Sequence, residues 1–219
     1  MTEPISVLVV DDHAMVRGTL GRYLNAEPDM RVVASVSNAD RAVVEATRLK
    51  PDIILMDIDM PGRFCFEAVQ TIRSMSRDTR VIFLSAFFHD RYIQQALGVQ
   101  AWGYVTKGES EQALIEAIRA VSSGEAYFSP EVQARIVVDT SGARLRQGTQ
   151  TTRTNTLTDR EMQVLQHVAR GMLRKVVAKT LGISAHTVDR HLTALMDKLD
   201  IHDRVELTRF AIREGLADA

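Results

Sequence analysis

Four apolar runs in the chain each end in a polar side chain that could take part in chemistry. The polar residues are two acids after the first run, one acid after the second, a hydroxyl after the third and an amine after the fourth: Asp11 and Asp12, Asp57, Ser85, and Lys107. Short apolar runs of this kind are typical of buried strands. Because ligands of an open parallel α/β sheet bind at the carboxyl ends of its strands, we expect these side chains to meet at one rim.

Three carboxylates brought together at such a rim repel one another, and each raises the pKa of its neighbours. A hard divalent cation relieves this repulsion, and Mg²⁺ binds one or two carboxylates together with waters and phosphate oxygens. The Asp57 carboxylate could then attack phosphorus as a nucleophile and form an aspartyl-phosphate. Ser85 and Lys107 could bind the phosphoryl oxygens. Any one acid alone would be interpreted as a loop acid without a ligand, but the ordered set favours a phosphoryl site.

Strands and helices alternate through residue 123, and this frame must position the polar set. The pattern of apolar residues predicts five strands and five helices, the helices at residues 14–25, 39–49, 64–74, 90–97 and 110–122. Such alternation predicts an α/β fold, a five-stranded doubly wound parallel sheet of the flavodoxin-like kind with helices on both faces.

Residues 1 to about 125 resemble a response-regulator receiver domain. On the matching positions, the resemblance implies that Asp57 is the phosphoacceptor and that Lys107 binds the phosphoryl group. It also implies that Ser85 is the switch hydroxyl and Tyr104 the switch aromatic residue. The phosphoryl group would come from a partner histidine kinase or from a small phosphodonor.

The same resemblance implies a Mg²⁺ site at the rim. The metal would be held directly by Asp12 and Asp57, through water by Asp11, and by the backbone carbonyl of Asp59.

Composition is that of a two-domain protein with ordinary cores. The chain has 219 residues, of which 45% are hydrophobic, and its net charge of −1 says nothing about partners. No apolar run approaches the roughly 20 residues that a membrane span needs, and the sequence at Met1 lacks the form of a signal peptide. Cys65 is the single cysteine, which fits a reducing cytoplasm. We therefore expect a cytoplasmic protein without a membrane partner.

A polar segment separates the two predicted domains. Ser129 and Pro130 open a predicted helix over residues 131–138, and residues 139–155 are almost free of apolar side chains. We interpret the latter as a flexible linker whose three arginines either keep it soluble or contact a DNA backbone weakly. The expected division is a first domain at 1–125, a short helix and linker at 126–155, and a second domain at 156–219.

The tail carries start and stop signals for four helices. Thr158 and Glu161 form a capping box, Ser184 and Asp203 can cap the third and last helices, and glycines end the first two. The resulting helices are expected at residues 159–170, 174–181, 185–199 and 204–215. Together they form a small all-α domain.

The third of these helices has an apolar face and a polar face. Its apolar face is formed by Val188, Leu192, Leu195 and Leu199, and its polar face by His186, Asp189, Arg190, Thr193 and Asp197. Helix, tight glycine turn and helix is the helix-turn-helix arrangement, whose second helix enters the major groove. A small bundle that packs against protein is the alternative.

A second resemblance favours DNA. Residues 157–161, 181–184, 187–192 and 198–199 look like the LuxR-type DNA-binding domain, and a receiver followed by this tail is the NarL/FixJ layout. On the matching positions, the expected phosphate contacts are Lys175, Thr187 and Lys198, and the expected base contacts are Arg190 and Thr193. Arg190 could bind a guanine bidentately.

The resemblance also implies partners. The last helix would supply contacts for a homodimer, and paired recognition helices imply an inverted-repeat site in double-stranded DNA. RNA polymerase could be a further partner.

The tail departs from the family pattern in places. Asp189 stands where a lysine is usual, so it either accepts from a cytosine amino group or weakens affinity for the backbone. Leu173 and Arg174 replace a small polar pair, so the second helix loses its usual cap. Val176 replaces an acid and is expected to be an exposed apolar residue. Residues 153–219 carry eleven Lys and Arg against nine Asp and Glu, a net charge of +2, so an unphosphorylated monomer should bind DNA weakly.

Three receiver residues carry narrower expectations. Cys65 stands where a glycine is common, so it either distorts the preceding loop or fills a gap in the core. Phe87 is hypothesised to exclude attacking water and to slow loss of the phosphoryl group. His13 could approach the metal, although a surface position at a helix start is the favoured interpretation.

We therefore expect a DNA-binding transcriptional regulator gated by phosphorylation, and not an enzyme. Charge delivered at Asp57 would pull Ser85 and reposition Tyr104, shifting a two-state surface that governs dimerisation or releases the tail. One alternative is an atypical regulator that acts on DNA or a protein without phosphorylation. Another is an aspartyl-phosphate phosphatase, because Asp57 and Asp59 form an Asp-x-Asp pair. That pair normally follows the first strand of its domain, whereas here it follows the third.

Overall fold

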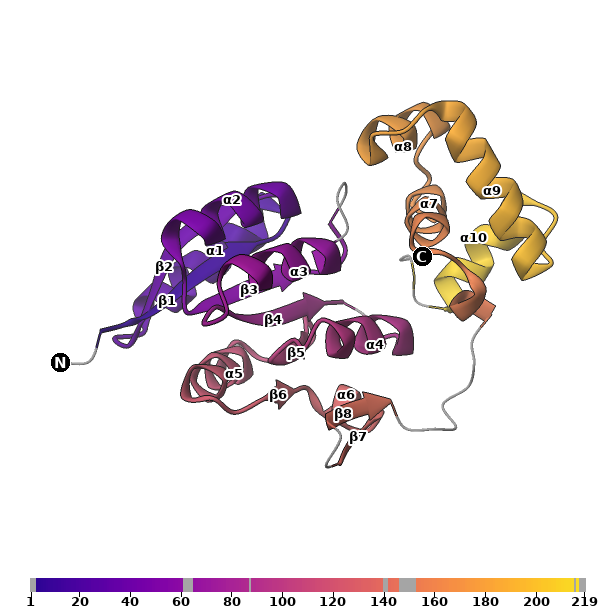
Figure 1. Ribbon diagram of the computed structural model, residues 1–219. Helices are drawn as coiled ribbons and strands as arrows, with labels where there is room; N and C mark the ends of the chain where they lie inside the picture. The colour runs from indigo at the N-terminus through magenta and orange to yellow at the C-terminus, as the bar shows by residue number, and fades with distance from the viewer. Residues whose placement is uncertain are drawn as a thin grey trace. The chain divides into compact units, whose positions relative to one another are not determined.

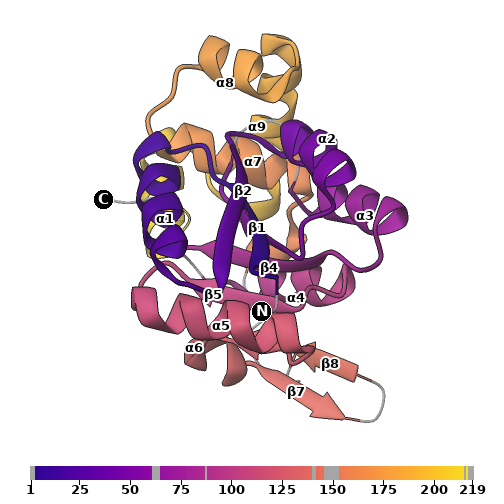
Figure 2. The ribbon, with the colours of Figure 1, turned by 90° about the vertical axis from the view of Figure 1, so that its left-hand side faces the viewer.

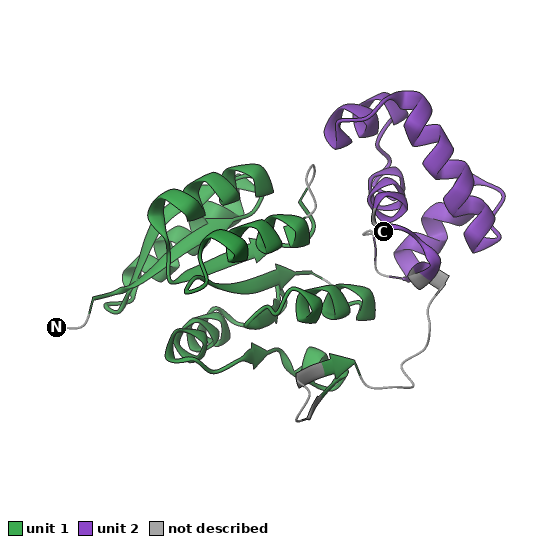
Figure 3. Cartoon of the chain, viewed as in Figure 1, with its two compact units in different colours: residues 1–149 green, residues 150–219 purple. Residues whose placement is uncertain are grey.

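The chain folds into two compact units, residues 1–149 and residues 150–219 (Figure 3). The computed structural model describes residues 3–60, 65–86, 88–139, 142–145, 153–214 and 216. Buried side chains of the first unit form two clusters, one on each face of a sheet, and those of the second unit form a third.

The first unit is a parallel sheet with helices between its strands (Figure 1). Its alternating elements are β1 (Ile5–Val10), α1 (Ala14–Ala26), β2 (Met30–Val36), α2 (Ala39–Leu49), β3 (Ile53–Asp57), α3 (Cys65–Met75), β4 (Arg80–Ser85), α4 (Asp90–Gly98), β5 (Gly103–Thr106) and α5 (Glu111–Ser123). The strand order is β2-β1-β3-β4-β5-β6, and every pair is parallel. The predicted parallel α/β architecture is confirmed.

The sheet is covered on both faces, which explains why its strands are apolar at consecutive positions. Successive side chains of a strand point to opposite faces. Leu8 and Val10 pack in the cluster with α2, α3 and α4, whereas Val7 and Val9 pack with α1 and α5. Figure 2 shows α1 and the pair α2 and α3 on opposite sides of the strands.

The segment after α5 differs from the prediction. The sheet has a sixth strand, β6 (Tyr127–Phe128), beside β5, where five strands were expected. The predicted helix over 131–138 is wrong in its second half: α6 (Pro130–Gln133) ends early, and β7 (Ile136–Asp139) pairs antiparallel with β8 (Gly142–Leu145). Residues 142–145 therefore form a strand within the predicted linker, and residues 140, 141 and 146–152 lie outside the described part of the chain.

Tertiary packing accounts for this departure. Phe128, Val132 and Ile136 are buried in the cluster that also holds Tyr104. Ser129 is buried as well, and its hydroxyl accepts from the Thr106 backbone N–H at 3.0 Å. Its own N–H donates to the Tyr104 carbonyl at 2.9 Å. The segment is thus part of the first unit, and residues 136–139 form a strand in it instead of continuing the predicted helix.

The second unit is a small helical fold. A 3₁₀ helix (Arg153–Thr156) precedes four helices, α7 (Asp159–Ala169), α8 (Arg174–Leu181), α9 (Ala185–Leu199) and α10 (Arg204–Arg213). The capping box of α7 is present, and the Ser184 and Asp203 side chains accept from backbone N–H groups of the helices that they precede. Gly171 and Gly182 follow α7 and α8 with positive φ angles of 77° and 65°, which favour glycine.

Two expectations about exposed elements also hold. Leu173 precedes α8 without a side-chain cap, as predicted, and Val176 is 46% exposed. Among the described residues, no helix is long and apolar enough to cross a membrane.

Candidate functional site

Strand register brings the polar set together at the carboxyl ends of four neighbouring strands. Val10 of β1 lies beside Met56 of β3, Asp57 lies beside Leu84 of β4, and Ser85 lies beside Thr106 of β5. The polar residues of the set either end these strands or follow them directly. The expectation of one shared rim is confirmed.

Three carboxylates and an imidazole form the centre of this rim. Ligand atoms from Asp11, Asp12, His13 and Asp57 all lie within 4.8 Å of one another. Asp11 and Asp57 are completely buried, whereas His13 is mostly exposed. His13 is exposed at the start of α1, the position that the sequence favoured, and its Nδ1 also lies 2.8 Å from Asp12 and 3.2 Å from Asp11.

Lys107 lies across two of these acids. Its Nζ is 2.8 Å from Oδ2 of Asp11 and 3.1 Å from Oδ1 of Asp57. Burial acts to lower the pKa of Lys107, but the two carboxylates outweigh it and raise that pKa above its ordinary value. The ammonium is therefore held in its charged form at the place where a phosphoryl oxygen would arrive.

The surroundings of Asp57 shift the pKa of its carboxyl. Burial raises its pKa to about 6, with the Asp11 and Asp59 carboxylates adding to the rise and Lys107 opposing it. Within the described part of the chain, its buried Oδ2 has no hydrogen-bond partner. A buried carboxylate oxygen without a partner, beside two further acids, is a donor set that suits a hard divalent cation. The residues present thus fit the Mg²⁺ that the sequence suggests.

The expected switch residues lie next to this cluster. Ser85 is fully buried, and its hydroxyl donates to Oδ2 of Asp59 at 3.3 Å. The Asp59 backbone N–H donates to Oδ1 of Asp57 at 3.2 Å. Tyr104 is completely buried, which raises the pKa of its hydroxyl, and a hydrogen bond with Ser85 acts in the opposite direction. A short chain of contacts therefore runs from Asp57 to Tyr104.

Arg17 contacts the rim, and the sequence analysis did not identify it as a site residue. Its Nη1 donates to the Asp11 backbone carbonyl at 2.7 Å, six residues back along the chain. The signal available in the sequence was its place in α1, one turn after the acidic pair.

Two of the narrower expectations meet different outcomes. Cys65 is buried in the core, with its Sγ 3.7 Å from the Ile58 carbonyl, and burial raises the pKa of its thiol. It fills core space, as one of the two interpretations held. Phe87 and residues 61–64 lie outside the described residues, so the hypothesis on Phe87 remains a prediction.

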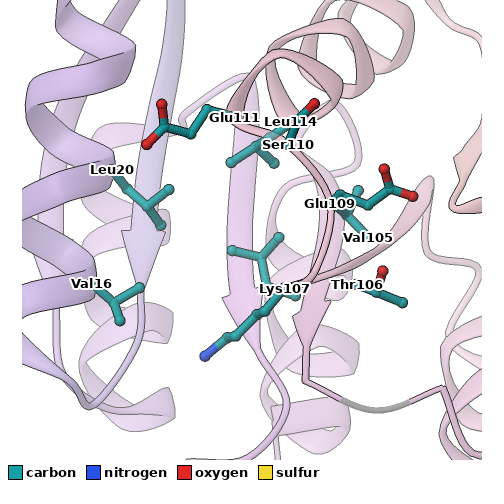
Figure 4. Close-up of a pocket in the computed structure, with 10 residues that line it drawn as sticks. Val16, Leu20, Val105, Thr106, Lys107, Glu109, Ser110, Glu111 and Leu114 are labelled. Atoms are coloured by element: carbon teal, nitrogen blue, oxygen red, sulfur yellow. The ribbon is translucent and has the colours of Figure 1, made fainter.

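A cavity of about 220 Å³ lies between α1 and α5 on one side of Lys107 (Figure 4). Its walls are mainly apolar, with Val16 and Leu20 from α1 facing Leu114 from α5. Among the residues that the structure describes, the other charged side chains that line it are those of Glu109 and Glu111. We place the chemistry at the acidic cluster because the cavity lacks a comparable set of converging polar groups.

In the second unit, the predicted DNA-contacting residues are distributed over α8 and α9. Lys175, Arg190, Thr193 and Lys198 are exposed, whereas Thr187 and Asp189 are partly exposed. Val188, Leu195 and Leu199 are buried on the opposite face of α9, so the predicted two-faced helix is confirmed.

Two of these residues are engaged in ion pairs within the unit. Lys198 donates to both oxygens of Glu161, at 2.9 and 2.7 Å. Asp189 accepts from Nη1 of Arg174, at 2.9 and 3.0 Å. The sequence identified all four residues but paired none of them.

Comparison with known families agrees with the resemblance that the sequence shows in each of its two domains. Residues 7–119 match the family described as response regulator receiver domain. Residues 155–211 match the family described as bacterial regulatory proteins, luxR family.

Curated relatives match the chain along nearly its whole length. The transcriptional regulatory protein LiaR of Bacillus subtilis is 34% identical over 98% of this chain and 100% of its own. The response regulator protein VraR of Staphylococcus aureus is 32% identical over 97% of this chain and 98% of its own.

Solved structures show the fold as well. A LuxR-family response regulator from Aurantimonas sp. SI85-9A1 superposes with a TM-score of 0.58 at 30% identity, over 60% of this chain and 94% of its own. The RcsB response regulator of Salmonella typhimurium superposes with a TM-score of 0.70 at 19% identity, over 97% of this chain and 99% of its own. From the two family matches and the whole-length relatives, the chain belongs to the two-component response regulators that join a receiver domain to a LuxR-type DNA-binding domain, a family of transcriptional regulators and not of enzymes.

Proposed function

We propose that Asp57 accepts a phosphoryl group and that this event controls sequence-specific DNA binding by residues 156–219. The observation that carries the proposal is the buried Oδ2 of Asp57, which has no hydrogen-bond partner among the described residues, at a rim where Lys107 and two more acids converge. The phosphoryl donor would be a histidine kinase or a small phosphodonor.

The transfer requires little beyond positioning and charge. Oδ2 of Asp57 attacks phosphorus, an O–P bond forms, and the bond between phosphorus and its leaving group breaks. Lys107 then turns its ammonium from the carboxylates to the new phosphoryl oxygens, and Ser85 turns its hydroxyl from Asp59 to the same group. Both side chains already lie within reach of the site.

The metal site is proposed on the same residues. Asp12 and Asp57 would bind Mg²⁺ directly, Asp11 would bind it through water, and the backbone carbonyl of Asp59 would complete the protein ligands. When bound, Mg²⁺ neutralises the repulsion among the carboxylates and between them and the phosphate.

The signal would leave the site through Ser85 and Tyr104. Tyr104 lies in β5, which pairs with β6, and the Ser129 hydroxyl closes the same edge on Thr106. A shift of Ser85 toward the phosphoryl group would remove its contact with Tyr104 and bias a two-state packing of this edge. That shift would favour dimerisation or release the tail for DNA binding.

On DNA, α9 would enter the major groove. Arg190 and Thr193 would contact base edges, and Lys175, Thr187 and Lys198 would contact phosphates. Asp189 would alter the sequence preference. Two copies joined through α10 would read an inverted repeat in the cytoplasm, and RNA polymerase would be the downstream partner.

The domain boundaries belong to the same proposal. The receiver is placed at 1–125, the connecting segment at 126–155 and the DNA-binding domain at 156–219.

Selection of bound DNA from a random pool, with and without beryllium fluoride as a phosphoryl mimic, tests the function. We expect a palindromic sequence to be enriched from the pool and beryllium fluoride to increase binding to it by at least tenfold. Asp57→Asn should bind the same sequence without the increase. Asp78→Asn removes an exposed acid that precedes β4, at the opposite end of this strand from Ser85, and should behave as the parent protein does.

Two outcomes would redirect the proposal. An Asp57→Asn variant with the full affinity of the activated parent would favour the regulator that acts independently of phosphorylation. A parent protein that enriches no sequence in either state would reject DNA reading by the tail.

A further inference from the structure

Arg174 and Asp189 form an ion pair that joins the two helices of the helix-turn-helix. Arg174 is the first residue of α8, and Asp189 is the fifth residue of α9. Nη1 of Arg174 lies 2.9 Å from one carboxylate oxygen of Asp189 and 3.0 Å from the other. One nitrogen thus bridges both oxygens of the carboxylate.

This pair contributes little to folding. The two side chains are 56% and 42% exposed, and an ion pair in that setting is typically worth about 0–1 kcal/mol. Its position is therefore better explained by a role in ligand binding at this surface than by a contribution to the stability of the unit.

The pair lies on the polar side of the recognition helix. Arg190 follows Asp189 directly, and Thr193 is one turn further along the same helix. Arg190 and Thr193 are both exposed and are the residues proposed to contact bases. In a helix-turn-helix, the N-terminal half of the second helix meets the base edges. A carboxylate at Asp189 therefore approaches a groove bordered by phosphates.

An unpaired carboxylate in that place would be repelled by the DNA backbone. Arg174 cancels this charge while occupying one lone pair on each oxygen. A carboxylate has about four acceptor sites, so each oxygen keeps capacity for a donor. In the major groove the exocyclic amino groups of cytosine and adenine are donors, and carboxylates pair with cytosine.

We infer that Asp189 is a specificity-determining residue that accepts from a cytosine amino group, and that Arg174 is its charge-compensating and positioning partner. The inference rests on the proposed DNA-binding function and names one base contact of that function. It also joins the two departures at residues 174 and 189 into one unit, in which Arg174 offsets the charge of Asp189.

A double-mutant cycle on the full chain tests this unit. The variants are Asp189→Ala, Arg174→Ala and the double variant, and the readout is affinity for the selected DNA sequence and for every single-base replacement of it. Asp189→Ala should lose about tenfold of the preference at one base pair, in the range of a single good base contact. Preferences at the other base pairs should stay unchanged.

The other two variants of the cycle test whether Arg174 compensates the charge of Asp189 or only contacts it. Arg174→Ala should weaken binding to all sequences several-fold, because it leaves the carboxylate uncompensated. The double variant should bind more tightly than Arg174→Ala alone, because removing the acid also removes the repulsion. Asp189→Asn should move the preference at that base pair toward adenine, since an amide offers both a donor and an acceptor.

Matched substitutions control for charge alone. Asp197→Ala removes an exposed acid eight residues further along α9, and Arg170→Ala removes an exposed arginine directly after α7. Neither should change the base profile at the position that Asp189 reads.

Results that overturn the inference are distinct from those that reject the function. A parent protein that selects a DNA sequence, together with an unchanged base profile in Asp189→Ala or losses that simply add in the double variant, would overturn the Asp189 and Arg174 unit. A parent that selects no sequence would reject the proposed function and this inference together.

Discussion

Arg135 donates from Nη1 to the Asp90 carboxylate at 2.6 Å, although 45 residues separate the two in sequence. The same guanidinium lies 5.0 Å from the centre of the Phe88 ring. Asp90 begins α4, and Arg135 lies between α6 and β7. The pair thus ties the segment after the sheet to the start of α4, and β8 also contacts that helix.

Arg135→Ala should lower the free energy of unfolding of the first unit by about 1 kcal/mol. The change removes a partly exposed ion pair and a cation–π contact, each worth up to about 1 kcal/mol. Urea denaturation followed by fluorescence measures it, because the single tryptophan, Trp102, reports on this unit alone. Arg41→Ala, at an exposed site on α2, is the control and should have an effect below about 0.5 kcal/mol. Equal effects of the two variants would show that the contacts of Arg135 with Asp90 and Phe88 do not stabilise the first unit.

Asp57→Asn should stabilise the metal-free protein by about 3 kcal/mol at pH 8, because the fold raises the pKa of this carboxyl to about 6. A raised pKa means that folding favours the protonated form. The contribution of protonated Asp57 is complete below about pH 4 and is lost as pH rises through about 6. The advantage of Asn should therefore appear over that window, measured by the Trp102 signal at a series of pH values.

Magnesium supplies the matched control for this prediction. Millimolar Mg²⁺ should stabilise the parent protein and leave Asp57→Asn nearly unchanged, since a ligand that binds only the folded state stabilises it. Equal stabilisation of both proteins would place the cation elsewhere. An advantage of Asn over Asp57 that is as large at pH 4 as at pH 8 would contradict the sign.

Lys198→Ala should destabilise the second unit by about 1–2 kcal/mol at neutral pH. Burial acts to raise the pKa of Glu161, but Lys198 and the backbone of Thr158 outweigh it and lower that pKa. A lowered pKa gives stability above the unfolded value that is lost as pH falls through the folded one. The difference between variant and parent should therefore shrink below about pH 4, as measured by hydrogen exchange in α7.

Lys175→Ala is the comparison for this variant. Lys175 is exposed, and among the described residues no ion pair is recorded for it. Both substitutions should reduce DNA affinity and its salt dependence, by about one unit of slope each. Only Lys198→Ala should increase exchange in α7, so increased exchange in Lys175→Ala would argue against the role of the Glu161 pair.

Gly103→Ala should destabilise the first unit by about 1–3 kcal/mol and weaken the pairing of β5 with β6. An added Cβ would lie 3.0 Å from the Tyr127 carbonyl oxygen and 3.1 Å from the Ile82 side chain. Gly21→Ala on α1 is the control: its Cβ would meet nothing within 4 Å, so it should stabilise by up to about 1 kcal/mol. The midpoints of thermal unfolding of the two variants test this prediction. A Gly103→Ala variant as stable as the parent would mean that β6 shifts to accommodate the added Cβ at little cost in free energy.

The sequence by itself determined the features that depend on local pattern. Apolar runs followed by Asp11, Asp57, Ser85 and Lys107 were sufficient to predict a shared rim, because parallel strands must end at one edge. Capping at Thr158 and Ser184 and the glycine stops in the tail were equally readable, since a helix end is satisfied by residues within one turn. These signals act over a few residues, or through one general rule of sheet topology.

Tertiary structure alone decided the contacts between distant residues. The segment after α5 forms β6 and a hairpin because Phe128 and Ile136 pack in the core of the sheet and the buried Ser129 hydroxyl accepts from the Thr106 backbone N–H. Likewise, charge patterns did not reveal that Arg174 meets Asp189 across the turn. The partner of a surface charge or of a strand edge depends on which elements pack beside it in the folded chain. The pattern of residues along the sequence does not specify that packing.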